Sequence, residues 1–130
     1  DSGIGHKEAL LELGRAWAKK SSESGDQSYL EQAKAYFAAA AGKEGQVDTQ
    51  LCDYIGKFYY EIEDYQTALA WFEKGLGLET SNRELLFNQA ACYEHMHDYQ
   101  KALYLFKTYQ SNFQDDAKAA HEIAFLESRL

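Results

Sequence analysis

The feature that most constrains this fold is a stretch of ten residues that occurs twice with few changes. Residues 63–72 read EDYQTALAWF, and residues 97–106 read HDYQKALYLF. The two stretches begin 34 residues apart, and the same offset connects Gly56 to Ala90 and Ala90 to Ala124. Self-similarity at a fixed offset of this length is typical of repeat proteins, in which similar units stack on one another. We therefore expect a repeat architecture.

The spacing of apolar residues predicts that each unit is helical. Leu10, Leu13 and Trp17 recur at intervals of three and four residues, the spacing of a helix face rather than a strand. The chain contains no proline, so the strongest helix breaker is absent. We predict an all-α chain without strands, with seven helices at roughly 6–20, 28–42, 48–62, 65–78, 82–96, 99–112 and 116–129.

Polar residues mark where these helices are expected to begin. Ser28 with Glu31 and Ser81 with Glu84 fit the capping box, in which two side chains satisfy the free backbone donors of a new helix. Further N-caps are predicted at three aspartates: Asp64, Asp98 and Asp115. The segment KSSESGDQS between the first two helices is expected to be a polar, flexible loop.

The repeats resemble the tetratricopeptide repeat (TPR) family, whose pattern places a large residue, Leu-Gly and Tyr on a first helix and Ala-x3-Phe on a second. The first half occurs as Leu10-x2-Leu13-Gly14-x2-Trp17, Cys52-x2-Ile55-Gly56-x2-Tyr59 and Leu86-x2-Gln89-Ala90-x2-Tyr93. The second half occurs as Ala33-x3-Phe37, Ala68-x3-Phe72 and Ala102-x3-Phe106. The family's terminal proline is missing, and Tyr109 stands where the earlier repeats have Ala40 and Gly75.

The resemblance implies a right-handed superhelical solenoid of antiparallel helix pairs. We expect a single TPR domain over residues 1–130, with repeats at about 7–47, 49–82 and 83–116 and a capping helix at about 116–130. The small residues at the matching places would let the two helices of a repeat approach closely: Gly14, Gly56, Ala90, Ala33, Ala68 and Ala102. The abrupt start at Asp1 suggests a piece of a longer protein.

By the same resemblance, function belongs to the concave surface lined by the first helix of each repeat, where peptides or partner helices lie. The predicted partner-binding groove residues are Leu11, Arg15, Asp53, Tyr54, Lys57, Tyr60, Glu84, Phe87, Asn88, His95, His121 and Phe125. Aromatic faces among mixed charges suit the gripping of a peptide. The alternative is that these residues are partly buried packing residues.

One specialised binding mode can be tested on the sequence. TPR domains that hold the C-terminal carboxylate of a chaperone use two lysines, two asparagines and an arginine. The residues at those places here are Leu11, Arg15, Tyr54, Glu84 and Asn88. Only the asparagine agrees, and Glu84 would repel a carboxylate, so we do not expect this mode.

Charge and composition exclude several other functions. The net charge of −8 would repel phosphate backbones, so no nucleic-acid partner is expected. No run of eighteen apolar residues occurs, so we expect no membrane insertion. His95 and His97 stand two apart, whereas zinc ligands on a helix normally stand four apart. We expect no enzyme activity, no catalytic residues, no metal and no cofactor.

The favoured hypothesis is an adaptor or scaffold that binds a protein or peptide. One alternative is a homo-oligomeric self-association or assembly module of a larger bacterial envelope or secretion complex, using convex-face tyrosines: Tyr29, Tyr36, Tyr65, Tyr99 and Tyr104. Another is a bacterial secretion chaperone. Cys52 and Cys92 are expected to be free buried thiols, which favours the cytoplasm. The bacterial periplasm is the alternative if a signal or anchor was removed.

Overall fold

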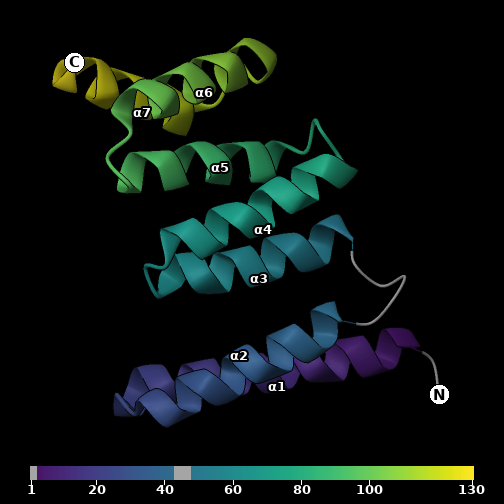
Figure 1. The fold of residues 1–130 in the computed structure, drawn as a ribbon. Coiled ribbons are helices and arrows are strands. Elements are labelled where there is room, and N and C mark those ends of the chain that lie inside the picture. The colour runs from purple at the N-terminus through teal and green to yellow at the C-terminus, as the bar shows by residue number, and fades with distance from the viewer. Residues whose placement is uncertain (1–2, 43–47) are drawn as a thin grey trace. The chain divides into compact units, whose positions relative to one another are not determined.

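The computed structural model describes residues 3–42 and 48–130 (Figure 1). Over these residues the chain forms seven α-helices and no strand: α1 (Gly3–Ser24), α2 (Gln27–Ala41), α3 (Thr49–Glu61), α4 (Tyr65–Leu78), α5 (Arg83–His95), α6 (Tyr99–Asn112) and α7 (Ala117–Arg129). The prediction of an all-α chain is therefore confirmed. The predicted end of the first repeat at residue 47 and the chain start at Asp1 lie outside the described residues.

The helices fall into two compact units. The first, Asp1–Val47, contains α1 and α2, which pack side by side in opposite directions (Figure 1). The second, Asp48–Leu130, contains the other five helices. Within it α3 packs on α4, α4 on α5, α5 on α6 and α6 on α7, so that each helix contacts the next along the chain. This nearest-neighbour arrangement is how repeat arrays bury their apolar faces.

Aspartate and asparagine side chains begin six of the described helices. The caps predicted at Asp64 and Asp98 are confirmed, since their carboxylates accept the backbone N–H groups of Thr67 and Lys101, each at 3.2 Å. The remaining capping residues are Asp26, Asp48, Asn82 and Asp116.

The predicted caps Ser28, Ser81 and Asp115 are wrong in each case. Asp26 accepts both the backbone N–H of Ser28, at 2.9 Å, and its hydroxyl, at 2.8 Å. The other two caps are displaced by one residue, to Asn82 and Asp116, because the side chains at those positions reach the free donors three residues on.

The prediction of a loop at KSSESGDQS is also wrong. Helix α1 continues to Ser24, and only Gly25 and Asp26 separate it from α2. Gly25 has a φ of +76°, a left-handed conformation that glycine adopts at little cost. Its N–H donates to the carbonyl of Ser21 at 2.7 Å, which closes the last turn of α1. A polar segment with no proline thus forms helix up to the first glycine.

The small residues do mark the helix crossings. A Cβ atom built on Gly14 would lie 2.8 Å from the ring of Phe37, and one built on Gly56 would lie 2.5 Å from the ring of Phe72. Both distances are too short for real carbon atoms, so these rings occupy the space that a side chain would need. The opposing residues Ala33, Ala68 and Ala102 are completely buried.

We predict that Gly56→Val lowers the free energy of unfolding by about 1–3 kcal/mol, because the added methyl groups must displace the Phe72 ring. Gly77→Val is the matched control, since apart from its chain neighbours and the backbone of its own helix nothing lies within 4 Å of a Cβ atom built at that position of α4. Urea unfolding followed by circular dichroism measures both. Equal unfolding midpoints for the two variants would contradict the close approach of α3 and α4.

Candidate functional site

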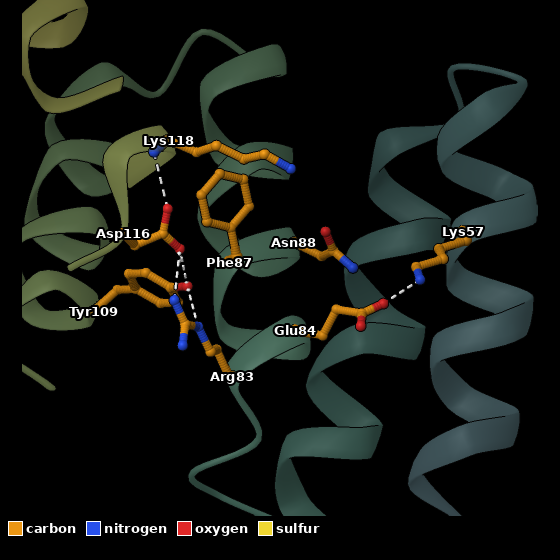
Figure 2. A pocket seen from close by; sticks show the side chains of 8 residues that line it. All are labelled: Lys57, Arg83, Glu84, Phe87, Asn88, Tyr109, Asp116 and Lys118. Carbon is orange, nitrogen blue, oxygen red and sulfur yellow. Dashed lines mark hydrogen bonds and ion pairs between the residues drawn. The ribbon is translucent and has the colours of Figure 1, made fainter. Parts of the chain in front are cut away.

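The helices α3, α5 and α7 of the second unit, with Tyr109 of α6, surround a pocket of about 470 Å³, here called the central pocket (Figure 2). Its lining residues are Lys57, Arg83, Glu84, Phe87, Asn88, Tyr109, Asp116 and Lys118. A second pocket of about 300 Å³, the α3-side pocket, shares Glu84 with it. Its other lining residues are Thr49, Gln50, Asp53 and Asn82. The two pockets together are called the groove.

Helix α5 supplies half of the central pocket because of its periodicity. Arg83, Glu84, Phe87 and Asn88 are spaced so that one face of a helix carries all four. Asn82 fixes the start of this helix by accepting the N–H of Leu85 at 3.0 Å. Leu85, on the opposite side, is completely buried and anchors the helix in the core.

At the α3 end of the groove, two carboxylates share one cation. The Nζ atom of Lys57 lies 3.1 Å from Asp53 and also forms an ion pair with Glu84. Asn88 donates to Asp53 at 3.3 Å. Burial raises the pKa of Asp53, and nearby Glu84 adds to this rise while Lys57 opposes it. The α3 end therefore carries more negative than positive charge.

At the α7 end, Asp116 joins three groups. It accepts the phenolic hydrogen of Tyr109 and lies 3.3 Å from the guanidinium of Arg83, while Arg83 donates to Tyr109 at 3.0 Å. It also accepts the backbone N–H groups of Lys118, at 2.9 Å, and Ala119, at 3.2 Å. These hydrogen bonds, that of Tyr109 foremost, lower the pKa of Asp116.

Lys118 differs from the other two cations of the central pocket. Within the part of the chain that the structure describes, no carboxylate lies within ion-pair distance of its Nζ atom. Its side chain runs past the ring of Phe87 (Figure 2). The ammonium group is therefore available to an anionic group of a ligand.

Phe87 provides a fixed apolar surface in the middle of the central pocket. Its ring is half-buried and packs edge-on against Phe106, with centroids 5.1 Å apart, and against Tyr109, with centroids 5.5 Å apart. Two such contacts restrict its rotamers. Little ordering would be needed before a ligand packs on it.

Beyond this pocket, α5 carries a second group of polar and aromatic residues. His95 stacks on Tyr65, with ring centroids 4.5 Å apart, and Tyr60 meets both rings edge-on. Glu94 of α5 lies beside Glu122 of α7. Burial and the neighbouring carboxyl group raise the pKa of Glu94 to about 7.

The predicted groove residues have different surroundings. Lys57, Glu84, Phe87 and Asn88 line the central pocket and Asp53 lines the α3-side pocket. Tyr60 and His95 belong to the aromatic group just described. Tyr54 is half-buried on α3, while His121 and Phe125 are exposed on α7. Leu11, half-buried, and Arg15, exposed, lie on α1 of the first unit.

Sequence reasoning omitted Arg83, Tyr109 and Asp116 from the groove residues. The available signal was Tyr109, a large polar residue where the two earlier repeats have Ala40 and Gly75. Its hydroxyl needs partners when the ring is buried. Arg83 and Asp116 are those partners.

The described residues also include two cysteine thiols. Cys52 and Cys92 are free and buried, as predicted, and burial raises the pKa of Cys92 to about 12. Thiols in such surroundings are inert. Over residues 3–42 and 48–130, no cluster of three metal-ligating side chains occurs, and no helix is long and apolar enough to cross a membrane.

Comparison with known proteins identifies the fold. No family model and no curated protein matches the chain. Among solved structures, the TPR domain of Arabidopsis OM64 aligns over 99% of this chain and 100% of its own, with a TM-score of 0.76 and 16% identity. The N-terminal domain of stress-induced protein-1 from C. elegans aligns over 98% of both chains, with a TM-score of 0.74 and 16% identity.

A further similar structure is the first TPR domain of Spaghetti (RPAP3), bound to an HSP90 peptide, with a TM-score of 0.67 and 10% identity over 92% of this chain and 94% of its own. These likenesses show that the fold is a TPR-type, all-α helical repeat.

We predict that Asp116→Ala lowers the free energy of unfolding by about 1–2 kcal/mol, because α7 loses its N-cap and Arg83 loses its carboxylate. Asp115→Ala removes a carboxylate from the exposed neighbouring position. It is expected to change the free energy of unfolding by less than about 0.5 kcal/mol. Chemical unfolding of both variants measures the difference. A larger loss for Asp115→Ala would show that the wrong aspartate has been assigned as the cap.

The Glu94 pair predicts a dependence of stability on pH. Because the folded chain raises the pKa of Glu94 to about 7, it binds more protons than the unfolded chain between pH 5 and 7. The contribution of Glu94 to the free energy of unfolding is fully present below the pKa that this group has in the unfolded chain. It is lost as the pH rises through about 7. We expect the urea midpoint to fall over this range, and to fall less in Glu122→Gln. Glu61→Gln, an exposed change on α3, is the control and should keep the wild-type slope.

Proposed function

We propose that this chain is a non-catalytic protein-interaction module that binds a peptide segment or helix of a partner protein in the groove formed by α3, α5 and α7. In this role it would act as an adaptor or scaffold. The observation that carries the proposal is the central pocket of about 470 Å³, in which the half-buried ring of Phe87 lies among charged side chains. An aromatic anchor surrounded by polar groups is typical of the energetic centre of an interface.

The fold supports the same proposal. TPR domains with similar structures are bound to peptides, an HSP90 peptide in the first domain of Spaghetti (RPAP3) and an HSP70 peptide in the second domain of human RPAP3. The groove here lies on α3 and α5, the first helices of the second and third repeats predicted from the sequence, together with α7. We therefore expect the partner to lie across these helices.

The mode of binding is expected to differ from capture of a terminal carboxylate. Glu84 stands at one of the places where that mode uses a cation, and the neighbouring Lys57 is already paired with it. Arg83 is likewise paired with Asp116. A segment in the interior of a partner chain fits this groove better than a free carboxyl terminus.

We predict that Phe87→Ala weakens partner binding more than about tenfold, since aromatic anchors at interface centres commonly contribute 2 kcal/mol or more. Asn88→Arg, which fills the groove without removing apolar area, is a second variant. Tyr104→Ala is the matched control, because Tyr104 is an aromatic residue of α6 that is 66% exposed and lies outside the groove. Circular dichroism verifies that each variant is folded.

The measurement is affinity capture from native lysate followed by crosslinking, which identifies both the partner and the segment that contacts α5. Loss of the same partner from both groove variants, with retention by Tyr104→Ala, is the expected result. Partners that are retained by the groove variants and lost from Tyr104→Ala would instead favour the self-association or assembly role of the convex tyrosines.

A further inference from the structure

The two ends of the groove carry opposite excess charge, although the pocket as a whole is nearly balanced. At the α3 end, Lys57 is the cation for two carboxylates, those of Asp53 and Glu84, so one negative charge is left over. Glu84 lines both pockets and is 60% exposed at its side chain, so this excess faces the groove.

At the α7 end the imbalance has the other sign. Arg83 has a single carboxylate partner, Asp116, whose other oxygen is occupied by the backbone of α7. Lys118 has no carboxylate within ion-pair distance among the described residues. One positive charge is therefore left over, on a chain whose net charge is −8.

Phe87 and Asn88 lie between Glu84 and Asp116, and the side chain of Lys118 reaches past the ring of Phe87 toward Asn88 (Figure 2). The ring of Phe87 is held edge-on by Phe106 and Tyr109, so it offers an apolar surface of fixed position. A ligand in the groove thus meets the excess negative charge at Asp53 and Glu84, the aromatic ring of Phe87 and, beside that ring, the ammonium group of Lys118. Complementary charges at an interface determine the choice and register of a partner more than its affinity.

We infer that the groove selects an internal segment of a partner protein that carries a basic, an apolar and an acidic side chain. The basic side chain lies at Asp53 and Glu84, the apolar one packs on Phe87, and the acidic one pairs with Lys118. This inference rests on the proposed function and adds to it the chemistry of the segment. The need for both charges follows from the two opposite excess charges, of which a uniformly acidic or uniformly basic segment would match only one.

The test is a selection from random dodecapeptides joined through their carboxyl ends to a phage coat protein, so that no peptide has a free carboxyl terminus. The selection uses the wild-type chain and Lys118→Glu. It also uses Lys101→Glu, which makes the same change of charge on α6 outside the groove. Glu84→Gln is a fourth target, which tests the α3 end. Circular dichroism verifies that each target is folded.

We expect the wild-type chain and Lys101→Glu to enrich, by at least about fivefold, peptides that combine an acidic, a basic and an aromatic or aliphatic residue. Lys118→Glu should lose the acidic residue and gain a basic one in its place. Glu84→Gln should lose the preference for the basic residue. In every target the apolar residue should be retained.

Two results would overturn the inference while leaving the proposed function in place. One is enrichment of apolar peptides without the charged pair, and the other is the same charged pattern selected by Lys118→Glu and the wild-type chain. Failure to enrich any peptide would also overturn it. The proposed function is tested separately by the lysate partner and its loss from Phe87→Ala, so a captured partner whose crosslinked segment lacks the charged pair would refute this inference alone.

Discussion

The close contact between an aromatic ring and a residue with little or no side chain is the interaction on which the rest of this structure depends. The ring of Phe37 fills the space where a Cβ atom on Gly14 would lie, and that of Phe72 does so at Gly56. Because the helices of a pair can approach so closely, the buried phenylalanines reach into the layer between them. The third pair uses Ala90 and Phe106, both completely buried. Between the second and third pairs this small residue and this phenylalanine each recur after 34 residues, which is the period of the sequence.

The end of the second unit is built by residues that also line the groove. Asp116 begins α7 by accepting two backbone N–H groups, and with the same carboxylate it binds Tyr109 and Arg83. The start of α7, and therefore the position of Lys118, depends on this set of bonds. Stability of the last helix and the charge of the groove cannot be changed independently at Asp116.

The sequence predicted the helices well because their signals are local. Apolar spacing and the repeat gave seven helices whose ends mostly agree with the structure to within about two residues. The errors are also local. Ser28, Ser81 and Asp115 were competing polar residues next to the true caps, and the end of α1 depended on the left-handed backbone of Gly25 rather than on the polarity of its flanking residues.

The groove was harder to predict because it depends on tertiary partners. The face of α5 could be read from periodicity, and Glu84, Phe87 and Asn88 do line the central pocket. The roles of Arg83 and Asp116 could not be predicted, since nothing in a single sequence shows that residues 33 positions apart form an ion pair. That pair determines which positive charges of the central pocket are open to a ligand, because Arg83 is already bound to Asp116. With two of three pocket cations already paired, bulk charge attraction contributes little, and it is screened over about 8 Å in physiological salt. Selectivity of the proposed binding would therefore come from short-range contacts with the fixed ring of Phe87 and with the excess charges beside it.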